Sequence, residues 1–152
     1  MLEVKWQDTE VTNARQFIFG GKSEFTIANI DSGKGAKYKV NRCKTDDKMF
    51  FVNVKDKESY TYAGFMKVDK DGSVSYIQGK KGNLEPSAEP IKGLMWAIRQ
   101  PEGPLRKPIV MFHHGSCACC GKSLDDPLSI GRGIGPVCWN RLKARYKDTN
   151  II

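Results

Sequence analysis

The chain has 152 residues, of which 39% are hydrophobic and 28% charged, and it carries a formal net charge of +8. This length suits one ordinary domain or a domain with a small appendage, and no apolar run approaches the roughly 18 residues of a membrane-spanning helix. Fifteen glycines and seven prolines indicate many turns and short strands rather than a helical bundle. The positive charge favours polyanionic partners, above all nucleic acid or an acidic protein surface.

The N-terminal residues include acids where a signal peptide would have an apolar run, so we expect a cytosolic protein. The chain has five cysteines. In a protein without an export signal, cysteines favour a metal site or free thiols over disulfides.

Residues 1–85 are predicted to form an antiparallel sheet with one buried and one solvated face. The short apolar run 15–21, closed by two glycines, is grouped with the strands and turns of this part. Turn residues bound the other apolar or alternating runs, which predict two hairpins and a strand between them. The expected strands are 24–30 paired with 36–42, then 49–55, then 59–68 paired with 73–79.

Residues 86–108 are predicted to be a linker that contains a short amphipathic helix. Apolar residues recur at helical spacing within 91–100, and Pro90 suits the first helical position. Residues 109–113 are expected to form a strand that leads into a cysteine-rich segment.

Residues 113–139, "HHGSCACCGKSLDDPLSIGRGIGPVCW", contain four of the five cysteines and both histidines. Cys117 and Cys120 are separated by two residues, a spacing at which two thiolates can bind one ion. Gly121 follows and allows the backbone to turn back with a positive φ. Cys119 competes with Cys120 for the second place, but the spacing favours Cys120 and predicts that Cys119 faces away.

Cys138 is the predicted third ligand. Two glycines precede Pro136, which suits the first position of a helix, so Cys138 falls in the first helical turn. Unpaired N–H groups and the helix dipole stabilise a thiolate there. The Gly-Ile-Gly-Pro turn is therefore expected to bring the start of a helix, with its ligand, to the turn that contains Cys117 and Cys120, which we call the knuckle. This is the arrangement of treble-clef-like zinc modules.

The fold class predicted from these elements is α+β. An antiparallel sheet domain is followed, over residues 109–152, by a small treble-clef-like zinc module that ends in a basic helix. Zinc would be structural here, because a module of this size is too small for a core of its own.

A closed structural zinc site needs a fourth ligand. His113, His114 and, less favoured, Cys43 are the candidates. Neighbouring residues of a strand point to opposite faces, so only one of the two histidines can reach the metal. Four free thiols, or an iron–sulfur centre that recruits Cys119 or Cys43, are the remaining interpretations of the cluster.

The cysteine-rich segment resembles the C-terminal signature of a family of small proteins from bacteriophages and prophages. Its members typically read His-x-Gly-x-Cys-x-x-Cys-Gly-(Arg/Lys)-x-Leu-x-x-Pro-x-Ser-Ile-x-x-Gly-Ile-Gly-Pro-x-Cys. The matching residues here are His113, Gly115, Cys117, Cys120, Gly121, Lys122, Leu124, Pro127, Ser129, Ile130, Gly133, Ile134, Gly135, Pro136 and Cys138. The β-rich front part of the chain is also similar, more loosely.

This resemblance implies that His113, rather than His114, completes a ligand set with Cys117, Cys120 and Cys138. It also implies a phage protein that acts in the cytoplasm of the infected bacterial host. Cys119 departs from the usual pattern. The family has no firmly assigned activity, so the resemblance implies a setting and a metal site but no reaction.

The function we expect is that of a non-enzymatic phage accessory protein that binds DNA or RNA through a basic surface. Its predicted residues surround the last helix and its start: Lys122, Arg132, Arg141, Lys143, Arg145 and Lys147. Lysines and tyrosines of the sheet are a second possible surface for unpaired bases, although such aromatics pack in cores more often. They are Lys37, Tyr38, Lys39, Tyr60 and Tyr62.

Two alternatives have different chemistry. The protein could bind a host protein, to block a defence or redirect replication. A metal-dependent nuclease is a remote alternative, because the chain has two histidines in all and one is expected on zinc. Asp125 and Asp126 are candidate bases near the metal, but Asp126 before Pro127 is better explained as a helix cap.

Overall fold

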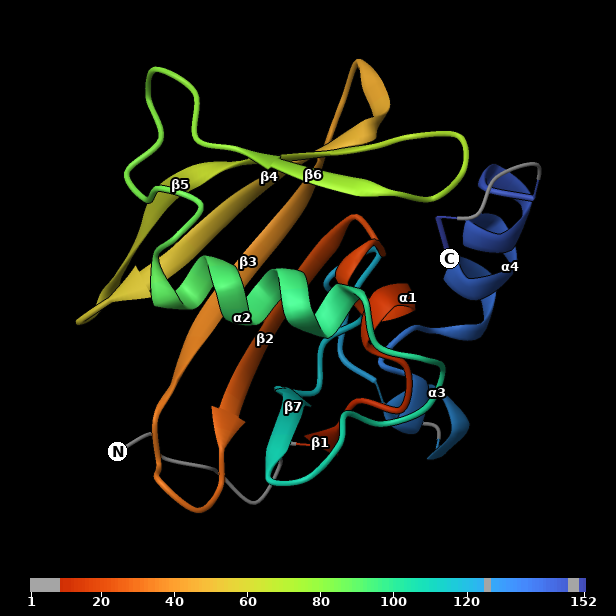
Figure 1. Ribbon diagram of the computed structural model, residues 1–152. Coiled ribbons are helices and arrows are strands. Elements are labelled where there is room, and N and C mark those ends of the chain that lie inside the picture. The colour runs from red at the N-terminus through yellow and green to blue at the C-terminus, as the bar shows by residue number, and fades with distance from the viewer. Residues whose placement is uncertain (1–8, 125–126, 148–150) are drawn as a thin grey trace.

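The protein is described by a computed structural model that covers residues 9–124, 127–147 and 151–152. The described residues form a seven-stranded antiparallel sheet in the order β1-β7-β2-β3-β4-β5-β6, with four helices around it (Figure 1). The strands are β1 Thr9–Glu10, β2 Lys22–Asn29, β3 Gly35–Cys43, β4 Asp46–Asp56, β5 Ser59–Val68, β6 Val74–Ile77 and β7 Ile109–His113. The helices are α1 Ala14–Ile18, α2 Glu89–Ile98, α3 Pro127–Arg132 and α4 Pro136–Arg145. The predicted antiparallel sheet is confirmed.

Both predicted hairpins are present. β2 pairs with β3 across the expected turn, and β5 pairs with β6. β4 connects the two hairpins by pairing with β3 on one side and β5 on the other. Alternation of apolar and polar residues located these strands because one face of an antiparallel sheet is buried and the other is solvated.

Helix α2 lies across one face of the sheet (Figure 1). The hydroxyl of Tyr38 in β3 donates to the carbonyl of Pro90 in α2 at 2.8 Å. Phe50 and Val52 of β4 point to the same face and are fully buried, as are Ile91 and Leu94 of the helix. The predicted amphipathic helix is therefore confirmed, and it covers the core of the sheet.

The apolar run at 15–21 is not a strand, so its grouping with the strands and turns was wrong for its first half. Residues 14–18 form helix α1, whose start is capped by the Asn13 side chain accepting from the Gln16 amide at 3.2 Å. Phe17 and Ile18 are fully buried. A helix of five residues is too short for its sequence to establish a helical period, and tertiary packing stabilises it.

Strand β7 was expected to open a separate zinc module, and it is a strand as predicted. It pairs with β2 from Phe25 to Asn29 and with β1 on its other edge. The C-terminal segment therefore begins inside the sheet. None of the described helices is both long and apolar enough to cross a membrane.

Candidate metal centre and its surroundings

Three cysteines converge directly after β7. The sulfur atoms of Cys117, Cys120 and Cys138 lie within 4.8 Å of one another, and such a group could hold a metal ion. Cys117 is buried, Cys138 is half-buried and Cys120 is exposed, so the group opens to solvent on the Cys120 side. The predicted Cys-x-x-Cys knuckle and its third cysteine are thus brought together.

The knuckle is a tight turn held by backbone hydrogen bonds. The Gly121 amide donates to the Cys117 carbonyl at 2.9 Å, and the Cys117 amide donates to the Lys122 carbonyl at 2.8 Å. Gly121 has a φ of +78°, a conformation that costs a glycine little and other residues much. This is the turn that the sequence predicted at this position.

The start of helix α4 brings the third sulfur to the knuckle. Gly135 is the N-cap residue, Pro136 stands in the first turn, and Cys138 follows within that turn as predicted. The Gly135 amide also donates to the sulfur of Cys117 at 3.4 Å. The helix start therefore supplies both a sulfur and an N–H group to the same site.

Hydrogen bonds to Cys117 favour its thiolate. The Cys119 thiol donates to its sulfur, and this bond, with the backbone amides of Gly135, Cys119 and Cys120, lowers the pKa of Cys117 to about 4. Burial and the neighbouring sulfurs raise the pKa of Cys138 to about 11. Two or three thiolates this close repel one another, and a bound cation removes that repulsion.

The expectation that Cys119 faces away as a spare thiol was wrong. Its amide donates to the Cys117 sulfur at 3.4 Å, and its thiol hydrogen-bonds to that sulfur. This hydrogen bond, together with burial and the negative charge of Cys117, raises the pKa of Cys119 above its usual range. Cys119 therefore supports the sulfur group from its side, while Cys120 takes the second place in it, as the spacing indicated.

The structure does not bring His113 into this group. The ring is fully buried and stacks on Phe17, with centroids 5.6 Å apart. Its Nδ1 accepts from the Gly115 amide at 3.0 Å, and its Nε2 lies 2.5 Å from the Ile130 carbonyl, to which it must donate. Nε2 therefore carries the ring proton, and the one ring lone pair, on Nδ1, faces the Gly115 amide.

The other two candidates for a fourth ligand also lie elsewhere. His114 Nε2 is 3.3 Å from the Thr26 hydroxyl. Cys43 is the last residue of β3, and its sulfur is 3.4 Å from the Thr45 hydroxyl. The candidate base Asp125 and the predicted cap Asp126 lie outside the described residues.

The knuckle packs against the turn between α1 and β2. The Lys22 amide donates to the Ala118 carbonyl at 2.6 Å. A Cβ atom on Gly20 would lie 2.7 Å from the Cβ of Ala118 and 2.8 Å from its carbonyl oxygen. Glycine is therefore required at position 20 for the two backbones to approach this closely.

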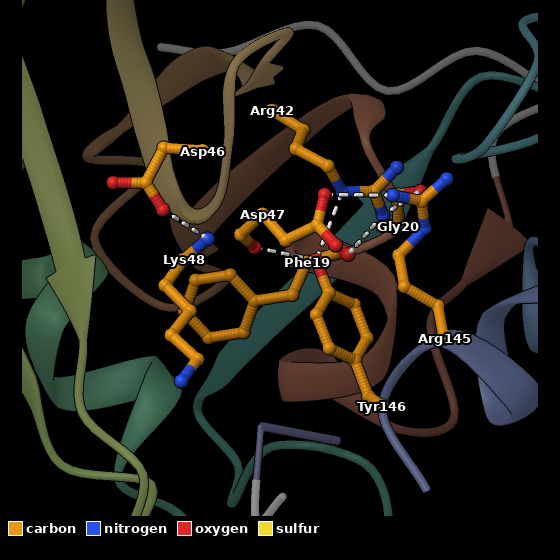
Figure 2. A network of polar contacts seen from close by, with 8 residues as sticks. All are labelled: Phe19, Gly20, Arg42, Asp46, Asp47, Lys48, Arg145 and Tyr146. Carbon is orange, nitrogen blue, oxygen red and sulfur yellow. Dashed lines mark hydrogen bonds and ion pairs between the residues drawn. The ribbon is translucent and has the colours of Figure 1, made fainter.

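An arginine of the sheet connects this turn to the end of the chain (Figure 2). Arg42 in β3 donates to the Tyr146 hydroxyl at 2.9 Å and to the carbonyls of Phe19 and Gly20 at 3.4 and 3.1 Å. The Tyr146 hydroxyl donates onward to the Asp47 carbonyl at 2.8 Å. The network fixes the end of α4 against the β3–β4 hairpin.

The basic residues predicted to bind nucleic acid have different surroundings. Arg145 forms an ion pair with Asp47 at 2.8 Å. The guanidinium of Arg132 and the ammonium of Lys143 lie over the Trp139 ring, 4.9 and 5.4 Å from its centroid. Lys122, Arg141 and Lys147 are exposed.

Arg141 also lines a small cavity of about 170 Å³ beside the sulfur group. Arg42 and Arg145 line the same cavity, together with Cys120 and Cys138. A neighbouring cavity of about 420 Å³ adds Lys22 from β2 and Lys44 from the β3–β4 turn, next to Asp47. Sequence reasoning missed Lys22, Arg42 and Lys44, because their proximity to α4 depends on long-range strand pairing.

Residues 111–143, from β7 to the last turn of α4, match a family of unknown function (DUF6011). No curated protein matches the chain. No solved structure matches it either. The matched segment is the one that contains the three cysteines.

Proposed function

We propose that the protein is a non-enzymatic nucleic-acid-binding protein whose C-terminal segment is held together by structural zinc. The observation that carries this proposal is the convergence of basic side chains from the sheet and from α4 beside the sulfur group. Lys22, Arg42 and Lys44 come from β2 and β3 or the turn after it, and Arg141 and Arg145 come from α4. Such a surface suits a phosphate backbone, with which lysine and arginine pair.

Zinc fits the donor set. Three sulfurs from a Cys-x-x-Cys turn and a helix start are soft ligands, and tetrahedral zinc takes such ligands in structural sites. When bound, the ion would supply charge neutralisation for Cys117, Cys120 and Cys138. The protein's own contribution is to orient the Cys117 sulfur through the amides of Cys119 and Gly135.

The resemblance of the cysteine segment to bacteriophage and prophage proteins supports a phage setting. Within this proposal the protein acts in the cytoplasm of an infected bacterium as an accessory factor. Among the described residues, the candidate metal group offers three thiolates, a donor type common in structural zinc sites, and a fourth ligand would complete the tetrahedron.

Charge reversal on α4 tests the nucleic-acid proposal. Arg141 and Lys147 are exposed, whereas Arg145 is paired with Asp47 and is left unchanged. The double variant Arg141→Glu and Lys147→Glu is expected to weaken binding of labelled DNA about tenfold or more at low salt. Fluorescence anisotropy at several salt concentrations measures this effect.

The matched control carries the same change in net charge elsewhere. Lys70 in the β5–β6 turn and Lys92 in α2 are also exposed, and Lys70→Glu with Lys92→Glu should weaken binding much less. Equal losses in the two double variants would show that net charge alone governs binding. A stoichiometric complex with a host protein that survives nuclease treatment, without DNA or RNA binding, would replace this proposal by the host-protein alternative.

A further inference from the structure

The face of the sheet opposite α2 carries a group of aromatic side chains. Phe50 and Val52 of β4 are buried under the helix, so Phe51 between them points the other way. Phe51 pairs with Phe65 of β5, and its ring packs edge-on against Tyr62. Phe51, Tyr62 and Phe65 are all half-buried, and we call them the aromatic strip.

The aromatic strip borders a hollow of about 510 Å³. Met49 and the three rings line it from the strands, and residues 78–81 line it from the loop after β6. Lys80 and Lys81 in this loop are exposed. The volume falls in the range of about 300–1,000 Å³ that is usual for sites of small organic groups.

The rings of Phe51 and Tyr62 are not stacked face to face. Phe51 and Tyr62 have centroids 6.2 Å apart and planes inclined at 62°. An edge contact of this kind leaves a ring face available to a flat partner. A hollow with an available aromatic face and a cationic rim suits a group that is planar at one end and anionic at the other.

Lysines extend this arrangement along the same face. The ammonium groups of Lys39 and Lys55 lie 4.5 and 5.9 Å from the ring centroid of Tyr60. The Tyr60 hydroxyl donates to the Glu24 carboxylate at 2.8 Å, which holds the ring near the two cations. Tyr60 pairs with Lys55 in the sheet, two positions along β5 from Tyr62.

We propose that this face binds single-stranded nucleic acid, with unpaired bases stacked on the aromatic strip and phosphates paired with Lys39, Lys55, Lys80 and Lys81. Bases stack on aromatic side chains without regard to sequence, and lysines follow the backbone. A duplex cannot use the hollow, because its bases are already stacked. This inference rests on the proposed function and adds to it a substrate class and a second surface.

The experiment compares binding of fluorescein-labelled oligo(dT) and oligo(U) of about 12 nucleotides with binding of a DNA duplex. The variant is Phe51→Leu with Tyr62→Leu, which keeps apolar bulk and removes the rings. We expect about tenfold weaker binding of the single strands and unchanged binding of the duplex. Oligo(dT) and oligo(U) distinguish DNA from RNA as the natural ligand.

The matched control is Trp96→Leu. Trp96 is an aromatic residue of α2, 37% exposed, on the opposite side of the sheet. Its replacement should leave binding of the single strands unchanged. In a second series, Lys80→Ala with Lys81→Ala should reduce the salt dependence of single-strand binding by about 0.7 in log–log slope for each phosphate that is no longer neutralised.

Photo-crosslinking of the unaltered protein to oligo(dT) containing 4-thiothymidine gives a readout that does not depend on variants folding. We expect crosslinked peptides from β4 and β5 that contain Phe51, Tyr62 or Phe65. Crosslinks confined to α4, or full single-strand binding by the leucine variant, would overturn this inference and leave the proposed function standing. Absence of binding to any nucleic acid would overturn both.

Discussion

The role of His113 can be decided by replacing it with glutamine. The cysteine pattern and its resemblance to phage proteins predict that His113 is a zinc ligand. The structure instead buries the ring against Phe17, with both nitrogens hydrogen-bonded inside the protein. We therefore expect His113→Gln to destabilise the fold and to leave about one zinc per chain in place, bound by the three cysteines.

The expected decrease in stability follows from the contacts of the ring. Removing its stacking on Phe17 costs about 1 kcal/mol. Each buried polar group left without a hydrogen bond, the Gly115 amide or the Ile130 carbonyl, costs about 1–3 kcal/mol. Because glutamine can restore part of this bonding, we expect a decrease of about 2–3 kcal/mol in the free energy of unfolding.

The assay combines elemental analysis of the purified protein with urea denaturation. Phe17→Leu is the matched control, because it weakens the same core packing and leaves the His113 side chain in place. Cys138→Ser is the reference for loss of zinc. If His113→Gln loses its zinc while Phe17→Leu, at similar stability, keeps it, the argument from the ring contacts fails and His113 is the fourth ligand.

Three further predictions concern the packing around the site. Arg42→Lys should lower the free energy of unfolding by about 1–3 kcal/mol in urea denaturation, because lysine cannot reach Tyr146 and the two carbonyls together; an unchanged midpoint would contradict this. Gly20→Ala should lower the melting temperature and weaken zinc binding in a chelator competition, because the new Cβ would meet Ala118 at 2.7 Å; unaltered zinc affinity would show that the knuckle can shift freely. Burial raises the pKa of Tyr76 to about 12, above the usual value of about 10, so its contribution to stability is complete below pH 10 and is lost between pH 10 and 12. The melting temperature should fall less steeply between pH 10 and 12 for Tyr76→Phe than for the unaltered protein. An equal fall in the two proteins would refute the raised pKa of Tyr76.

Much of the sheet was predictable because its pattern is local. Residues 36–42 alternate between a buried and a solvated side, and Tyr38 and Val40 are indeed buried between half-buried neighbours. Helix α2 was predictable for the same reason, since its apolar residues recur at helical spacing on the side that covers the sheet. Helix α1 was not, because its five residues are too few to establish a period, although the buried Ala14, Phe17 and Ile18 lie at helical spacing.

Some features of the candidate site were likewise predictable from local sequence, and others depend on distant residues. The spacing of Cys117 and Cys120, and the Gly-Pro start of the helix that carries Cys138, are local features that determine where the sulfurs lie. The direction in which the nitrogens of His113 point depends on the Ile130 carbonyl, 17 residues away. No spacing rule distinguishes a histidine that binds a metal from one that binds a carbonyl.

The basic surface depends on the topology of the sheet. β7 pairs with β2, so the knuckle that follows β7 meets the turn that precedes β2, where Gly20 lies. β3 pairs with the other edge of β2, and this places Arg42 beside the same turn and within reach of Tyr146. Basic residues about 100 positions apart in the chain thus come together because a late strand is inserted beside an early one. A metal that holds Cys138 to the knuckle would therefore keep the basic side chains of α4 beside those of the sheet. Loss of zinc is then expected to weaken nucleic-acid binding as well.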